Sequence, residues 1–63
     1  MSKIYDNIVE RAKEKKVSIR EVERECSLSP GSVCKWNKVS PSVNNLQKVA
    51  DVLECSLAEL IKE

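Results

Sequence analysis

Four serines, each standing just before apolar residues at helical spacing, constrain the fold of this chain more than any other feature. Ser18 and Ser56 are each followed three positions later by a glutamate. This pattern is the capping box, which marks the first turn of a helix. Ser29 precedes a proline, a residue well tolerated at the first helical position, and Ser42 follows one. The four serines therefore predict where four short helices begin.

The spacing of the apolar residues predicts five helices and an all-α fold. Apolar residues recur every three or four positions, whereas no long segment alternates with the period of two that is typical of a strand. A first helix is expected over about residues 3–15, and the other four follow the serines. The residues expected on the buried sides of the helices are Ile4, Ile8, Ala12, Ile19, Val22, Cys26, Val33, Trp36, Val43, Leu46, Val49, Ala50, Leu53, Leu57, Leu60 and Ile61.

The length of 63 residues fits one domain, residues 1–63, with a small core. A chain of this size buries about 60% of the surface that its unfolded form exposes. With one Trp, one Tyr and no Phe, the core has to be built from aliphatic side chains and cysteine. No apolar run reaches the roughly 20 residues of a membrane-spanning helix, and the N-terminus has no signal-peptide pattern. We expect a cytoplasmic protein, either complete at this length or the N-terminal domain of a longer chain.

The residues that enzymes and metal sites most often use are missing. The sequence has no histidine, the commonest general base and metal ligand. Its three cysteines, Cys26, Cys34 and Cys55, form no C-x-x-C pair, so we interpret them as reduced and mostly structural thiols. We therefore expect no catalytic residue, no metal, no cofactor, no small-molecule substrate and no membrane partner.

The net charge of +1 conceals a segregation of charge along the chain. Residues 11–24 carry six basic and three acidic side chains, and residues 26–50 carry three lysines and no acidic side chain. The last 13 residues reverse the sign, with four acidic side chains and one lysine. Chance is the alternative explanation in so short a chain. We favour a positive middle segment that faces an anion.

The second and third predicted helices are separated only by Ser27 and Leu28, which is the arrangement of a helix-turn-helix over about residues 18–37. Residues 17–36 resemble the Cro/CI-type (XRE-like) helix-turn-helix family, which includes small phage repressors. The resemblance continues through residues 40–42, 46–51 and 56–60. It implies a five-helix, lambda-repressor-like DNA-binding domain.

The resemblance also implies a function. Members of this family are sequence-specific regulators of transcription, commonly repressors, which insert the third helix into the major groove of double-stranded DNA and bind a palindromic operator as homodimers. The positions that read bases in the family correspond here to Pro30, Gly31, Cys34 and Lys35. The positions that hold phosphates correspond to Arg20, Ser29, Ser32, Lys38 and Ser40.

Residue chemistry agrees with part of this assignment. Backbone amides at a helix N-terminus suit a phosphate, and Lys35 is long enough to reach the O6 and N7 atoms of guanine. Pro30 and Gly31 offer no side-chain hydrogen bond, so selectivity has to use DNA shape as well as direct contacts. Two positions depart from the family pattern: Ile19 replaces a common glutamine, and Ser27 replaces a glycine. A left-handed backbone at Ser27 would cost about 1 kcal/mol.

The dimer surface and the class of partner have alternatives. The last predicted helix offers Leu57, Leu60 and Ile61 as candidate dimer contacts. The alternative function is a protein-interaction module, such as an antirepressor or an antitoxin, which uses the same fold on a protein partner. The absence of hydrogen-bonding side chains at Pro30 and Gly31 keeps that alternative open.

Overall fold

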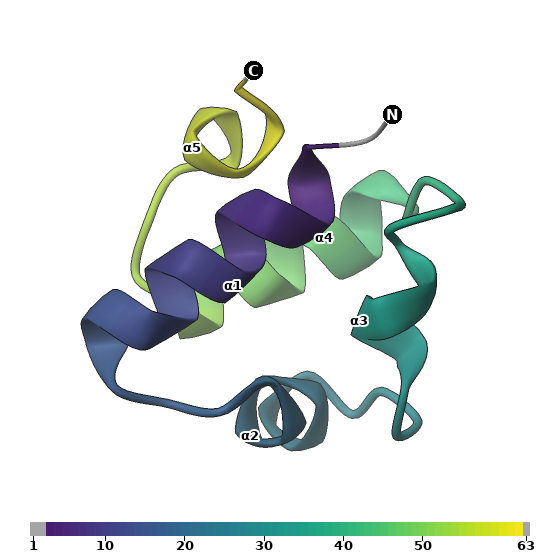
Figure 1. Ribbon diagram of the computed structural model, residues 1–63, viewed down its shortest axis with the longest axis horizontal. Helices are drawn as coiled ribbons and strands as arrows, with labels where there is room; N and C mark the ends of the chain where they lie inside the picture. The colour runs from purple at the N-terminus through teal and green to yellow at the C-terminus, as the bar shows by residue number, and fades with distance from the viewer. Residues whose placement is uncertain (1–2, 63) are drawn as a thin grey trace.

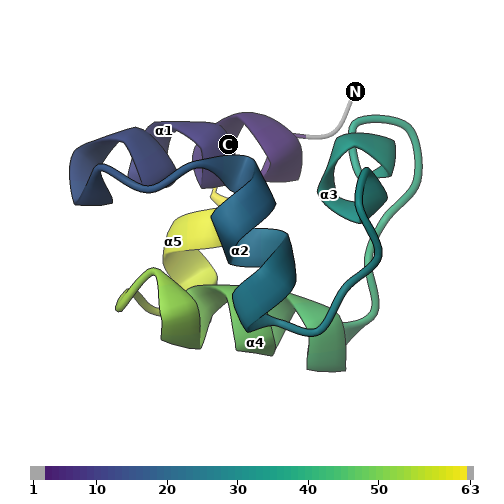
Figure 2. The same cartoon turned by 90° about the horizontal axis from the view of Figure 1, so that it is seen from below.

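A computed structural model describes residues 3–62, and within this range the chain forms five α-helices and no strand. The helices are α1 (Ile4–Lys15), α2 (Ile19–Glu25), α3 (Ser32–Lys35), α4 (Val43–Val52) and α5 (Leu57–Ile61). In Figure 1, α1 crosses in front of α4, and α2, α3 and α5 surround this pair. Figure 2 shows α2 between α1 and α4, with α3 at one side. The predicted all-α, five-helix fold is confirmed. No helix among the described residues is long and apolar enough to cross a membrane.

Serine side chains cap three of the helices, as the sequence predicts. In each case the serine Oγ accepts a hydrogen bond from the backbone amide three residues later, which satisfies one of the free amides of the first turn. These hydrogen bonds join Glu21 N to Ser18 (3.1 Å), Asn45 N to Ser42 (3.2 Å) and Glu59 N to Ser56 (3.3 Å). Local hydrogen bonding therefore sets the starts of α2, α4 and α5.

Three helices are followed by a residue with a left-handed backbone, and none of these residues is glycine. The φ angles are 61° at Lys16, 59° at Ser27 and 56° at Glu54. At each end, two successive amides donate to carbonyl oxygens of the last helical turn, which is the Schellman arrangement. The left-handed conformation expected at Ser27 is thus confirmed, and the same strain recurs after α1 and α4.

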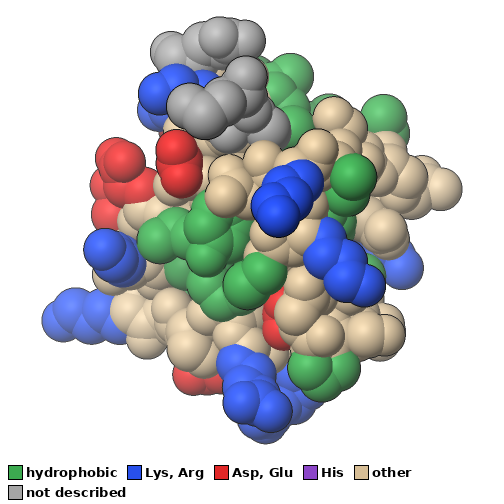
Figure 3. Space-filling view, turned by 45° about the vertical axis from the view of Figure 1, so that its right-hand side comes forward, with side chains coloured by type: hydrophobic (Ala, Val, Ile, Leu, Met, Phe, Trp, Pro, Cys, Tyr) green, Lys and Arg blue, Asp and Glu red, His purple; other side chains and the backbone are tan. Residues whose placement is uncertain are grey.

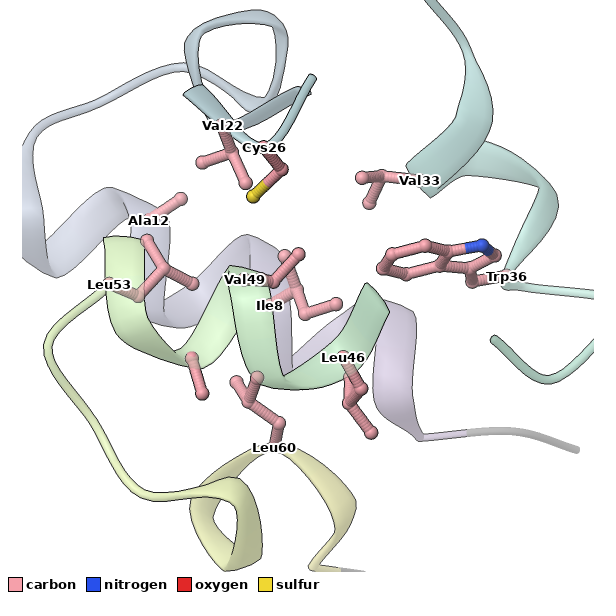
Figure 4. Close-up of a cluster of buried hydrophobic side chains, with 11 residues drawn as sticks. Ile8, Ala12, Val22, Cys26, Val33, Trp36, Leu46, Val49, Leu53 and Leu60 are labelled. Atoms are coloured by element: carbon pink, nitrogen blue, oxygen red, sulfur yellow. The ribbon is translucent and has the colours of Figure 1, made fainter. Parts of the chain in front are cut away.

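The core lies between α1, α2 and α4, and α3 and α5 close its sides. Figure 4 shows Val33 and Trp36 extending from α3 toward Ile8 and Val49, at the centre of the cluster. The thiol of Cys26 also lies inside, as a small apolar group. The buried hydrophobic residues are Ile8, Ala12, Val22, Cys26, Val33, Trp36, Leu46, Val49, Ala50, Leu53 and Leu60.

Two residues expected in the core are on the surface. Val43 is 69% exposed and Ile61 is 49% exposed. They are the first residue of α4 and the last residue of α5, where the helix extends past the elements that cover its apolar side. Ile4, Ile19 and Leu57 are partly buried and pack against the core from its edge.

Two polar side chains of α1 hold the C-terminal part of the chain in place. Arg11 donates to the carbonyl oxygens of Leu53 (3.2 Å) and Glu54 (3.1 Å), just after α4. Asn7 donates in the same way at the end of α5, to Leu60 (2.9 Å) and Lys62 (2.7 Å). The last carbonyl groups of a helix have no partner within the helix. Arg11 and Asn7 therefore supply, at the C-terminal ends of α4 and α5, the hydrogen bonds that water would otherwise make.

Candidate nucleic-acid interface

The connection between α2 and α3 forms a helix-turn-helix, but α3 begins two residues later than the sequence indicates. Ser29 does not cap the helix, and Pro30 is not its first residue. The amide of Ser32 donates to the carbonyl oxygen of Ser29 (3.0 Å), so Pro30 and Gly31 form a turn before the helix. Gly31 is the N-cap residue, with a φ of 87° that a residue other than glycine adopts only with strain. An added Cβ at Gly31 would meet open space, so backbone conformation alone requires the glycine.

A glutamate from α2 caps α3 in place of the serine. Glu23 is buried, with 4% of its surface exposed. Both of its carboxylate oxygens accept from the amide of Gly31 (3.1 Å each), and Oε2 also accepts from the amide of Val33 (3.0 Å). Burying a carboxylate is costly unless its oxygens are hydrogen-bonded, and these amides supply the bonds.

This arrangement corrects one expectation about phosphate binding. The amides of Gly31 and Val33, at the start of α3, already donate to Glu23 and are therefore not free to bind a phosphate. Glu23 is not among the site residues predicted from the sequence, where it appears only as one acidic residue of a basic segment. A signal was present, because Glu23 follows Val22 and precedes Cys26 by three positions, next to the buried side of the helix.

The residues predicted to read bases lie together on the outer side of the helix-turn-helix. Pro30, Gly31 and Cys34 line a shallow hollow between α2 and α3, together with Arg20. Lys35 is exposed on α3, directly after Cys34. The structure thus groups Pro30, Gly31 and Cys34 with Arg20, which was predicted as a phosphate contact, whereas Lys35 is exposed on α3 outside the lining of this hollow.

The cations on this side of the molecule are not neutralised by carboxylates. Among the described residues, the ion pairs are Arg11–Glu14, Lys15–Glu54 and Lys62–Glu59, and none of them involves α2 or α3. Arg20, Lys35 and Lys38 belong to none of them and are exposed. Figure 3 brings the α3 side toward the viewer and shows Lys and Arg side chains set among apolar and uncharged surface.

The remaining predicted phosphate contacts are placed less uniformly. Ser29 and Ser40 are exposed, whereas Ser32 is half-buried. The first turn of α1 also reaches this surface, because the side chain of Tyr5 lies close to that of Cys34, and the interaction between the two raises the pKa of Tyr5. Tyr5 was not among the predicted site residues.

The predicted dimer contacts on α5 divide into three different environments. Leu60 is fully buried in the core of its own chain, so its side chain is not available to a second copy. Leu57 is partly buried, and Ile61 is the exposed member of the three.

Within residues 3–62, no group of three His, Cys, Asp or Glu residues is placed to hold a metal ion.

Two short helices joined by a tight turn, with the second one exposed beside unpaired cations, define a helix-turn-helix protein of the nucleic-acid-binding class. The model of the Cro/C1-type HTH DNA-binding domain family matches residues 7–62. The chain belongs to this family, and its membership in a family of DNA-binding regulators confirms the resemblance found in the sequence.

Two solved structures are similar to the fold over nearly its whole length. The N-terminal DNA binding domain of SinR from Bacillus subtilis superposes with a TM-score of 0.86 and 26% sequence identity, covering 97% of this chain and 93% of that one. The P22 c2 repressor, solved in complex with the synthetic operator 9T, superposes with a TM-score of 0.83 and 23% identity, covering 94% and 92%. No curated protein sequence matches the chain.

Proposed function

We propose that this DNA-binding regulator is a sequence-specific repressor that inserts α3 into the major groove of its operator as a homodimer, without catalysing a reaction. The observation that carries the proposal is the exposed surface formed by α2, α3 and the residues just after α3, where Arg20, Lys35 and Lys38 have no acidic partner. An unpaired basic surface of this kind suits the phosphates and base edges of DNA. The similarity to the P22 c2 repressor, whose solved structure holds an operator, supports the repressor role.

The proposed contacts follow from the positions of the side chains. Lys35 and, through apolar contact, Pro30 and Cys34 would face the bases, and Gly31 would let the backbone approach closely. The proposed phosphate contacts are made by side chains, because the amides of Gly31 and Val33 donate to Glu23 and the amide of Ser32 donates to the Ser29 carbonyl oxygen. They are Arg20, Ser29, Ser32, Lys38 and Ser40.

The proposed dimer uses the exposed part of α5. Ile61 offers an apolar side chain there, and Leu57 borders it. Pairing two copies is part of the proposal because one copy brings few cations to DNA, and two half-sites together raise the affinity.

Selection of bound fragments from a random DNA pool tests the proposal directly. We expect enrichment of a two-fold symmetric sequence. Binding of that duplex, measured by fluorescence anisotropy, should weaken steeply between about 50 mM and 200 mM salt because phosphate contacts release counterions. Absence of binding to any fragment at low salt would reject DNA as the ligand.

A second candidate function is binding to a protein through the same region. Val39 and Val43, in and just after the connection from α3 to α4, are 57% and 69% exposed. Apolar side chains of this kind favour a protein surface rather than a phosphate backbone. Replacing both with serine should abolish capture of a protein from nuclease-treated lysate while leaving DNA affinity unchanged, if this candidate is correct.

A further inference from the structure

Glu23 is the buried charged residue of the described chain, and no ion pair of residues 3–62 includes it. Its charge is instead satisfied by the amides of Gly31 and Val33, eight and ten positions later. All three of these hydrogen bonds connect α2 to the start of α3. The carboxylate is therefore a fixed link between the two helices of the helix-turn-helix.

This link matters because α3 has little else to define where it begins. The helix spans four residues, and its N-cap residue, Gly31, has no side chain with which to cap it. A helix this short does not hold its geometry without outside contacts. Val33 and Trp36 anchor one side of α3 in the core, and Glu23 anchors its first turn.

We propose that Glu23 is a positioning residue for DNA recognition: by fixing the start and rotation of α3, it sets the preference for particular bases rather than the overall affinity for DNA. This inference rests on the proposed function. Lys35 lies two residues after Val33, whose amide Glu23 holds. A small shift of α3 would misplace Lys35 relative to a base edge, whereas long basic side chains still reach phosphates.

The test compares Glu23→Gln with Glu25→Gln. Each variant removes one negative charge from α2, but Glu25 is exposed and Glu23 is buried against α3. Glutamine at position 23 keeps one acceptor oxygen and places an NH2 group against an amide donor. Both variants are made in a Ser27→Gly background, which relieves the left-handed backbone at that position. Anisotropy gives their affinities for the selected duplex and for a scrambled duplex at one salt concentration.

We expect Glu23→Gln to lower the ratio of the two affinities about tenfold, comparable to one mismatched base pair, without weakening binding to the scrambled duplex. Glu25→Gln should change both affinities by the same factor. The amide proton resonances of Gly31 and Val33 should shift in Glu23→Gln only.

Three results separate the possible failures. If the background protein itself does not prefer the selected duplex, the proposed function is wrong. If it does, and Glu23→Gln keeps the ratio within twofold while circular dichroism shows a folded protein, the positioning role is wrong. If Glu23→Gln unfolds the whole domain even in this background, the role is overturned as well, because Glu23 would then stabilise the entire fold.

Discussion

Burial separates single residues of the same type into different roles, and two valines of α4 show this clearly. Val49 is fully buried, whereas Val43 is 69% exposed. We expect Val49→Ala to lower the free energy of unfolding by about 2 kcal/mol, since it removes buried methyl groups and leaves a cavity. Val43→Ala should change it by about 0.5 kcal/mol or less. Urea unfolding of the two variants checks this pair, and equal effects would contradict the described core.

Two lysines near α3 are expected to contribute to DNA binding in different ways. Lys35→Ala should weaken discrimination at one operator position by about 1–3 kcal/mol. Lys38→Ala should weaken binding to all sequences evenly and reduce the salt slope by about one. Competition binding with a set of single-base operator variants separates the two patterns. Lys13→Ala, on α1, removes the same charge away from this surface and serves as the control; a matching effect there would mean that only net charge counts.

Among the helices, the three non-glycine residues with a left-handed backbone make the fold less stable than glycine at the same positions would. Lys16 has a φ of 61° after α1, whereas Lys13 lies within the helix. Lys16→Gly should raise the free energy of unfolding by about 0.5–1 kcal/mol, because glycine adopts this conformation without strain. Lys13→Gly should lower it by about 1 kcal/mol, because glycine weakens a helix interior. Thermal unfolding measures both changes, and a common sign would contradict the backbone described here.

One ion pair between α1 and the residue after α4 makes stability depend on pH. Lys15 donates to Glu54 and holds the pKa of that carboxyl below its usual value. This pairing stabilises the fold above the unfolded-state pKa of about 4.3 and is lost as the pH falls through the lower folded-state pKa. In Glu54→Gln this contribution to the pH dependence should disappear. Acid unfolding of the two proteins, monitored by circular dichroism, measures this difference. An identical midpoint and slope for both proteins would count against the ion pair.

The helices were predictable to the extent that local chemistry decides them. Three serine caps and the apolar spacing indicate α2, α4 and α5 with their starts, because those bonds join residues three positions apart. The start of α3 was not predictable in this way. It depends on Glu23, whose bonds to residues eight and ten positions later exist only once α2 and α3 are packed together.

For the molecule as a whole, the near-neutral net charge is divided between surfaces. The ion pairs of the described residues involve α1, the residue after α4, and α5 with the residue after it, and none lies on α2 or α3. Arg20, Lys35 and Lys38, on and just after the helix-turn-helix, are outside these pairs, as are Lys13 on α1 and Lys48 on α4. The sequence indicated a basic middle segment, but it did not show which cations remain unpaired. That distinction requires the contacts of α1 with the end of α4, which join residues about 40 positions apart, such as Arg11 and Leu53.

The proposed homodimer predicts an effect of charge on α5. Ile61→Glu should weaken self-association more than tenfold, because it would bury a charge between two copies. Val43→Glu adds the same charge at an exposed aliphatic residue of α4, outside α5, and should leave self-association unchanged. Sedimentation equilibrium without DNA measures both variants. If Ile61→Glu associates like the unmodified protein, the dimer surface lies elsewhere.

The carboxylate of Glu23 has a consequence for the timing of recognition. The start of α3 is held by hydrogen bonds from within the chain itself, so the helix is defined by contacts that need no ligand. Meeting DNA therefore requires no ordering of this helix, and the surface is preorganised for its ligand. Association should then proceed at similar rates on correct and incorrect sequences, and the difference between them should appear in how long each complex lasts.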